Sequence, residues 1–261
     1  MKILLTGGAG FIGSHLLERL LARGDRVTVV DDLNDYYDSG LKRANLEAAR
    51  KIGNFSFAER DLRVGLADLL EVDAVVHLAA RAGVRPSLAD PELYHQVNVD
   101  GTLRLLEECR RSNVRRFVFA SSSSVYGDFP EVPFRENAGP LEPVSPYGAT
   151  KLIGEMYLGV YAKLHRLRAT ALRFFTVYGP RQRPDMAIRG FAEKILRGDE
   201  ISVFGDGTTE RDYTYVDDIL QGVLAAIDRD ESFEVYNLGE SRTVPLNYLI
   251  ELLEKIGRAH V

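Results

Sequence analysis

Short apolar runs and amphipathic segments alternate from the start of the chain. Residues 2–6 form an apolar run that ends at a pair of glycines, and residues 11–22 place apolar side chains at helical spacing. Residues 27–30 form a second apolar run, which ends in Asp31. This order predicts a strand, a glycine turn, a helix and a second strand, which together make a right-handed βαβ unit.

The same alternation continues through the first two thirds of the chain. Strands alternating with helices predict an α/β fold, a Rossmann-like doubly wound parallel sheet. The further strands are expected at 55–57, 74–78, 117–119 and 169–174, and the further helices near 92–112 and 147–166.

The pattern changes after Phe175, where a loop rich in proline and arginine begins and the later segments become less regular. We therefore expect residues 1–175 to form the Rossmann domain, with a later return segment near 212–238. Residues 176–261 are expected to form a smaller C-terminal lobe that binds the substrate.

Composition narrows the class of protein. The 261 residues include 33 Lys and Arg against 38 Asp and Glu, so the net charge is −5 and a nucleic-acid partner is not expected. Cys109 is the single cysteine, which excludes an internal disulfide or a cysteine zinc site and favours a reducing compartment. No run approaches the ~20 apolar residues of a membrane span, so we expect a cytoplasmic protein that does not bind a membrane. We also expect no metal site.

Three glycines mark the first turn as a candidate phosphate site. Gly7, Gly10 and Gly13 lie between the first strand and the first helix, where the missing β-carbons allow a pyrophosphate to approach the helix N-terminus. Asp31 follows the second strand, where a carboxylate would accept hydrogen bonds from ribose hydroxyls and repel a 2′-phosphate, which favours NAD over NADP. The alternatives are a packing turn and a solvated acid.

Hydroxyl groups and one lysine make a candidate chemical site. Four serines, 121–124, follow an apolar strand, at the edge where open α/β sheets bind ligands. Tyr147 and Lys151 are four residues apart, on one face of a helix. A nearby ammonium and a positive nicotinamide would favour the phenolate, which makes the tyrosine a usable base. A serine loop and a chance Tyr–Lys spacing are the alternatives, but their coincidence with the glycine turn favours catalysis.

Taken together, these motifs resemble those of the extended short-chain dehydrogenases/reductases, in the nucleotide-sugar epimerase and dehydratase group. The resemblance covers nearly the whole chain. The residues that carry it are Thr6-Gly7-Gly8-Ala9-Gly10-Phe11-Ile12-Gly13, Asp31, Asp61-Leu62, His77-Leu78-Ala79-Ala80, Asn98, the serine run, Tyr147 with Lys151, Arg211-Asp212-Tyr213 and Val216-Asp217-Asp218.

The resemblance implies NAD as cofactor and a catalytic set of Ser122, Tyr147 and Lys151. Tyr147 would take the proton of the sugar 4-hydroxyl while a hydride leaves C4, and Lys151 would hold the nicotinamide ribose. The residues implied to bind the cofactor are Gly7, Gly10, Phe11, Ile12, Gly13, Asp31, Asn34, Asp61, Leu62, Leu78, Ala79, Ala80, Asn98, Ala120, Tyr147 and Lys151.

Within the group, the chain is most similar to UDP-glucuronate 4-epimerases, over residues 82–87 and 173–187. Dehydration is disfavoured because Ser123 and Ser124 stand where related 4,6-dehydratases carry an Asp-Glu pair. A guanidinium such as Arg183 would hold the sugar carboxylate. The implied substrate contacts are Arg85, Ser122, Ser123, Ser124, Thr176, Arg183, Met186, Val203, Arg211 and Tyr213.

Several alternatives stay open from the sequence. A UDP-glucuronate decarboxylase would use the same 4-keto intermediate, a UDP-glucose/galactose 4-epimerase the same catalytic residues, and a sensor would bind NAD without turnover. Arg181 and Arg183 could also be solvated loop residues. Related proteins continue for several dozen residues beyond Val261, so the resemblance implies an incomplete, apparently truncated C-terminal lobe. It also implies a homodimer formed through the segments near 92–112 and 147–166.

Overall fold

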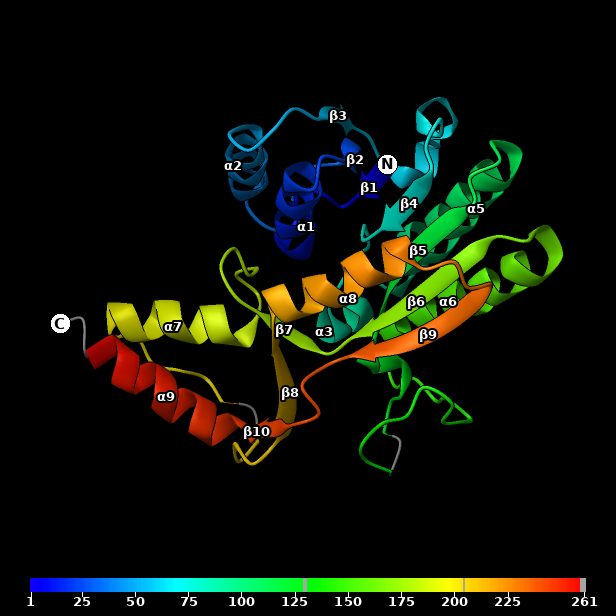
Figure 1. Ribbon diagram of the computed structural model, residues 1–261. Coiled ribbons are helices and arrows are strands. Elements are labelled where there is room, and N and C mark those ends of the chain that lie inside the picture. The colour runs from blue at the N-terminus through cyan, green and yellow to red at the C-terminus, as the bar shows by residue number, and fades with distance from the viewer. Residues whose placement is uncertain (129–130, 204, 259–261) are drawn as a thin grey trace.

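A seven-stranded parallel sheet forms the centre of the computed structural model, which describes residues 1–128, 131–203 and 205–258 (Figure 1). The strand order is β3-β2-β1-β4-β5-β6-β9, and the order reverses direction between β1 and β4. The α/β prediction is confirmed. The strands are β1 (Lys2–Thr6), β2 (Arg26–Asp31), β3 (Ser56–Glu59), β4 (Ala74–His77), β5 (Arg116–Ser122), β6 (Arg168–Phe174) and β9 (Phe233–Leu238).

Helices cover both faces of this sheet, and a separate apolar core lies under each layer. One core is formed with α1 (Phe11–Ala22), α2 (Ser39–Arg50) and α8 (Val216–Asp228). The other is formed with α5 (Gly101–Arg111) and α6 (Pro146–His165). The strands are buried on both sides, which explains why they are continuous apolar runs in the sequence.

The helical segment expected near 92–112 is interrupted by one wide turn. It begins as α4 (Pro91–His95), passes through a π-helical turn, Gln96–Asp100, and continues as α5. Such turns insert one extra residue and are frequent at functional sites. The remaining short helices are α3 (Val84–Ala89) and the 3₁₀ turns Leu62–Val64, Ala67–Leu69 and Ser123–Val125.

A smaller group of elements extends from the carboxyl edge of the sheet. The strands β7 (Thr176–Tyr178), β8 (Glu210–Tyr215) and β10 (Thr243–Pro245) form a three-stranded sheet. The helices α7 (Ala187–Arg197) and α9 (Leu246–Arg258) pack side by side next to it (Figure 1). Of the return segment expected near 212–238, β9 is a strand of the large sheet and α8 packs against that sheet, whereas β8 belongs to the small sheet. The domain bounds therefore remain a proposal.

The described part of the chain contains no helix long and apolar enough to cross a membrane. Within the same residues, no group of three or more His, Cys, Asp or Glu side chains is arranged to hold a metal ion.

Candidate active site

A cavity of about 370 Å³ opens at the carboxyl edge of the large sheet. It lies where the strand order reverses, which is the position at which open α/β sheets bind ligands. Most of the residues proposed from the sequence line it. These are Gly7, Gly10, Phe11, Ile12, Gly13, Asp31, Asn34, Asp61, Leu62, Leu78, Ala79, Ala80, Ala120, Ser122, Ser123, Ser124, Tyr147, Lys151, Thr176, Arg183 and Met186.

The first turn has the geometry of a phosphate cradle. Gly7 has a φ of +72°, and a Cβ at this position would lie 2.7 Å from the backbone nitrogen of Ala79. A Cβ on Gly13 would lie 2.1 Å from the carbonyl oxygen of Gly7. Gly10 caps α1 without any side chain, so the amides at the positive end of the helix face the cavity. The turn therefore fits a pyrophosphate such as that of NAD.

Asp31 ends β2 and organises the loop around it. Its carboxylate accepts hydrogen bonds from the backbone amides of Ala9 (3.2 Å) and Leu33 (3.0 Å) and from Nζ of Lys42 (3.2 Å). Burial raises the pKa of Asp31, and the positive charge of Lys42 opposes this rise only in part. Asp31 thus fixes the first turn, and its neighbour Asp32 also lines the cavity.

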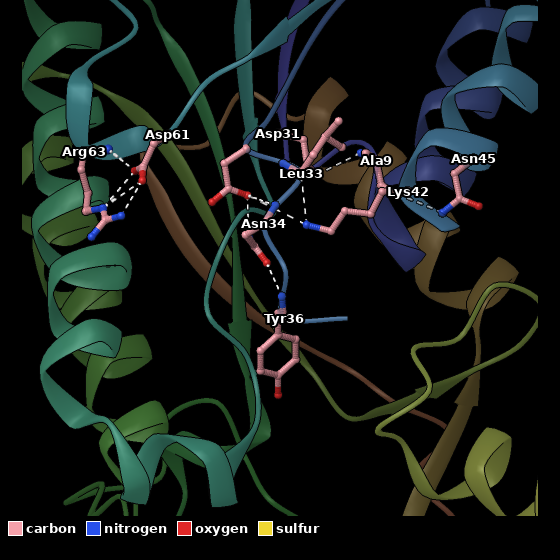
Figure 2. A network of polar contacts seen from close by, with 10 residues as sticks. Ala9, Asp31, Leu33, Asn34, Tyr36, Lys42, Asn45, Asp61 and Arg63 are labelled. Atoms are coloured by element: carbon pink, nitrogen blue, oxygen red, sulfur yellow. Dashed lines mark hydrogen bonds and ion pairs between the residues drawn. The ribbon is translucent and has the colours of Figure 1, made fainter. Parts of the chain in front are cut away.

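Lys42 is a residue that the sequence interpretation missed. It lies on the buried face of α2 with Leu46 and Ala49, at positions i, i+4 and i+7. A lysine among apolar positions of a helix is a sign of a buried ion pair, because lysine is seldom buried without a partner. Figure 2 shows Lys42 reaching from α2 toward the loop that follows β2.

Asp61 lies on the other side of this loop, where it pairs with Arg63 (Figure 2). Arg63 donates from Nε and Nη2 to one carboxylate oxygen, at 3.0 and 2.6 Å. Hydrogen bonds from Arg63 lower the pKa of Asp61, so the carboxylate is ionised at the rim of the cavity. An ionised acceptor here suits the amino group or ribose of an adenosine.

Ser122, Tyr147 and Lys151 converge from β5 and α6. Ser145 begins α6 by accepting the amide of Gly148, which sets the first helical turn so that Tyr147 faces the cavity. The Ser122 hydroxyl acts to lower the pKa of Tyr147, and it donates a hydrogen bond to the hydroxyl of Ser124 at 3.1 Å. Nζ of Lys151 lies 5.9 Å from the centre of the Tyr147 ring and donates to the carbonyl of Ala120 at 2.7 Å.

The sequence interpretation attributed the phenolate to the Lys151 ammonium and the nicotinamide charge together, and the structure shows the pKa of this pair without the nicotinamide. Burial raises the pKa of Tyr147, and the Ser122 hydroxyl and the charge of Arg183 oppose the rise without reversing it. Burial also lowers the pKa of Lys151 to about 7, against the opposing charge of Glu155. The chain alone therefore holds a neutral phenol beside an amine that titrates near neutral pH.

A chain of hydrogen bonds runs behind the cavity and fixes the tautomer of His77. The hydroxyl of Thr102 donates to the carbonyl of Asn98 at 2.6 Å, so it accepts from Nε2 of His77 at 3.0 Å. Nδ1 is then unprotonated and accepts from the hydroxyl of Thr6 at 2.7 Å. Thr6 in turn accepts the amide of Ala79 at 3.3 Å. The first turn is thereby tied to the π-helical turn through a neutral imidazole.

Asn98 extends the same chain of hydrogen bonds to α6, the helix that carries Tyr147 and Lys151. Its side chain exchanges two hydrogen bonds with the backbone of Arg81, at 2.8 and 2.9 Å, and donates to Thr150 at 3.1 Å. Thr150 then donates to the carbonyl of Tyr147 at 2.8 Å. Asn98 is buried behind the wall of the cavity, so the structure places it as a support of the wall.

Acid is expected to destabilise the protein through His77. Burial lowers the pKa of His77 to about 3, and the charge of Lys151 acts in the same direction. Between pH 6.5 and 3 the unfolded chain binds a proton that folded His77 does not, so the free energy of unfolding falls by up to about 1.4 kcal/mol per pH unit as the pH falls.

Urea unfolding from pH 6.5 to 5 measures this slope, since most carboxylates stay ionised there. His77→Gln keeps a hydrogen-bond donor and acceptor but has no titratable ring. Its free energy of unfolding should therefore depend less steeply on pH, by up to the contribution of one proton, about 1.4 kcal/mol per pH unit. Equal slopes for the two proteins would contradict the assignment.

Four proposed substrate residues lie outside the cavity. Val203 and Arg211 are exposed, and Tyr213 lies on β8 opposite Thr176. Arg85 lies on α3, which begins at the cavity-lining residue Val84. Their contact with a substrate stays a prediction.

The loop after β2 supplies cavity residues that the sequence interpretation omitted. Tyr36 and Tyr37 both line the cavity, and the hydroxyl of Tyr36 donates to the carbonyl of Ala82 at 2.8 Å. Arg81 also lines the cavity, with its guanidinium carbon 5.9 Å from the Tyr36 ring centre. Two adjacent tyrosines in an otherwise polar loop are the sequence feature that could have indicated a ligand-binding role for this loop.

Comparison with known families decides the class of protein. A family model described as "NAD dependent epimerase/dehydratase family" matches residues 3–239. The chain belongs to this family. Membership in the NAD dependent epimerase/dehydratase family confirms the resemblance inferred from the motifs and the expectation of NAD as cofactor.

Two related sequences of the family are named UDP-glucuronate 4-epimerases. The "UDP-glucuronate 4-epimerase" of Thermodesulfobacterium geofontis is 44% identical over 260 residues, which are 97% of this chain and 80% of that protein. The Arabidopsis thaliana "UDP-glucuronate 4-epimerase 4" is 42% identical over 276 residues, 98% of this chain but 63% of that protein. The chain thus spans less than two thirds of the plant relative.

Among solved structures of the family, the Bacillus cereus UDP-glucuronic acid 4-epimerase in complex with UDP-glucuronic acid and NAD matches with a TM-score of 0.93. It is 40% identical, and the match covers 99% of this chain and 83% of that one.

Proposed function

We propose that this protein catalyses the NAD-dependent 4-epimerisation of a UDP-sugar, converting UDP-glucuronate to UDP-galacturonate through a 4-keto intermediate. The observation that carries the proposal is the position of Arg183 on the cavity wall, together with Tyr147, Ser122, Ser123 and Ser124. A cation beside a cluster of hydroxyl donors suits a sugar carboxylate. The names of the T. geofontis and B. cereus relatives support the same substrate.

In this mechanism Tyr147 takes the proton of the sugar 4-hydroxyl and later returns it. Ser122 would donate a hydrogen bond to the same oxygen, and Lys151, whose Nζ lies 5.9 Å from the Tyr147 ring centre, would hold the nicotinamide ribose and add positive charge beside the phenol. The chemistry that NAD supplies when bound is acceptance and return of a hydride at C4, together with a positive nicotinamide charge that favours the phenolate. The sugar is reduced from its other face after it rotates, which inverts C4.

The carboxylate contact has a further chemical purpose. Oxidation at C4 of a glucuronate gives a β-keto acid, which loses carbon dioxide readily when its carboxylate lies out of the carbonyl plane. Arg183, Thr176 and the serines 123 and 124 would hold the carboxylate in the geometry that resists this loss. Decarboxylation to a UDP-pentose is the second candidate function, since it would share the oxidation step.

An NMR product assay on UDP-glucuronate with added NAD tests the proposal. We expect UDP-galacturonate to form until the two epimers reach equilibrium. Accumulation of UDP-xylose would assign the protein as a decarboxylase, and unchanged UDP-glucuronate in a sample that binds NAD would refute the proposed substrate.

We also propose a homodimer that forms through α6. Met156, Val160 and Leu164 are spaced four residues apart on this helix, and all three are exposed. An apolar stripe of this kind suits a two-helix contact with a second copy.

Cys109 is free and buried, and we propose the reducing cytoplasm as the location.

A further inference from the structure

Arg183 is held from behind by a carboxylate of its own loop. Its Nε donates to Oδ1 of Asp185 at 3.0 Å, and its Nη2 donates to Oδ2 of the same residue at 2.9 Å. Asp185 is exposed and is not part of the cavity wall, whereas Arg183 is. The ion pair therefore engages the guanidinium from the side away from the cavity.

This pairing uses one edge of the guanidinium and leaves another edge free. A guanidinium presents a side edge, made of Nε and one Nη2 proton, and an end edge, made of protons on both terminal nitrogens. Asp185 occupies the side edge through two hydrogen bonds. Nη1 makes no hydrogen bond with any of the described residues. The end edge is thus available for a second carboxylate.

Tyr36 fixes the plane of the same guanidinium. The guanidinium carbon of Arg183 lies 5.5 Å from the Tyr36 ring centre, within the range of a cation–π contact. The Tyr36 hydroxyl donates to the carbonyl of Ala82 and lies 3.3 Å from Oδ2 of Asp185. Tyr36 comes from the loop after β2, so this ring joins the Rossmann part of the cavity to the loop that carries Arg183.

We propose that Asp185 and Tyr36 are specificity-determining positioning residues, which hold Arg183 so that its free end edge faces the carboxylate of the substrate. The inference rests on the proposed function and adds to it the two residues that aim the guanidinium. Without them Arg183 would keep its charge but lose its fixed direction, and a bidentate contact depends on that direction.

A role in folding stability is not expected for this pair. Ion pairs between partly exposed groups close in sequence contribute little to stability, because water screens them. The side chain of Asp185 is 38% exposed. Asp185→Asn should therefore leave the melting temperature unchanged, while a positioning role would change how the protein distinguishes a uronate from a neutral sugar.

The test is equilibrium binding of UDP-glucuronate and UDP-glucose to the NAD-loaded full chain, measured by calorimetry. In the wild type we expect UDP-glucuronate to bind more tightly. In Asp185→Asn that preference should fall about tenfold, with UDP-glucose affinity unchanged, because only the carboxylate contact is lost. Tyr36→Leu should have the same effect, whereas Tyr36→Phe, which keeps the ring, should retain most of the preference.

A second site in the chain provides a matched control. Arg229 pairs with Glu231 two residues later and lies 5.1 Å from the ring centre of Tyr236, on the surface and outside the cavity. Glu231→Gln removes the same kind of partner from the same kind of arginine. It should leave the preference for UDP-glucuronate unchanged.

Binding and turnover separate the two proposals. An unchanged preference in Asp185→Asn, or a wild type that binds both sugars equally, would overturn the inference even if the wild type forms UDP-galacturonate. The opposite result is also possible: the wild type forms no UDP-galacturonate, but its preference for binding UDP-glucuronate is lost in Asp185→Asn. That result would uphold the inference and refute the proposed reaction.

Discussion

Replacing Tyr147 with phenylalanine is expected to lower kcat for UDP-glucuronate epimerisation by about 10²–10⁴-fold, the usual contribution of a general acid–base group. The change removes a single oxygen, so the ring still lines the cavity beside Lys151. Cofactor and substrate affinity should change little, since the proton transfer occurs only during turnover. Rates are measured by NMR, and NAD binding by fluorescence.

Tyr157→Phe is the matched control for this variant. Tyr157 lies on the same helix but outside the cavity, and the substitution removes the same hydroxyl oxygen. Its kcat should equal that of the wild type. A Tyr147→Phe variant with more than about a tenth of the wild-type kcat would show that another group transfers the proton.

Replacing Glu155 with alanine is expected to lower the free energy of unfolding by about 3–5 kcal/mol, because it leaves a buried cation without its partner. Glu155 and Arg173 have side chains only 6% and 4% exposed. Arg173 donates to the two oxygens of Glu155 at 3.0 and 2.8 Å, and Ser121 donates to the same carboxylate at 2.5 Å. Urea unfolding measures the loss.

The double variant Glu155→Leu/Arg173→Met shows whether the cost comes from the unpaired charge. Removing both charges should cost much less than the sum of the single changes, since no ion is then left buried. A loss below about 1 kcal/mol for Glu155→Ala would contradict this account of the pair.

The sequence was sufficient for the fold because the strands of a doubly wound sheet are buried on both faces. Their apolar runs and the helical spacing between them predict the strands and helices. The structure confirms the strands and the helix at Pro146–His165, and most of the proposed site residues line one cavity. The glycine turn and the Tyr147/Lys151 pair were recognisable because each depends on residues near one another in sequence.

The remaining features depend on contacts between distant segments. The Tyr36 ring contacts Arg183, which is far from it in the sequence, and no local pattern predicts that contact. The pKa of Tyr147 is set by burial, which spacing does not reveal. Asn98 was expected against the cofactor, but only the fold shows its amide turned to the backbone of Arg81.

The π-helical turn at Gln96–Asp100 acts as a one-residue spacer in the helix. A turn closed by i→i+5 hydrogen bonds holds about one residue more than an α-helical turn, so deleting one residue here would restore a regular helix and leave the segments on either side close to their present phase. Asn98 lies within this turn, so closing the turn would move its side chain from the Arg81 backbone and Thr150, and its carbonyl from Thr102. The extra residue is therefore what places Asn98, although the segment itself touches no reacting atom.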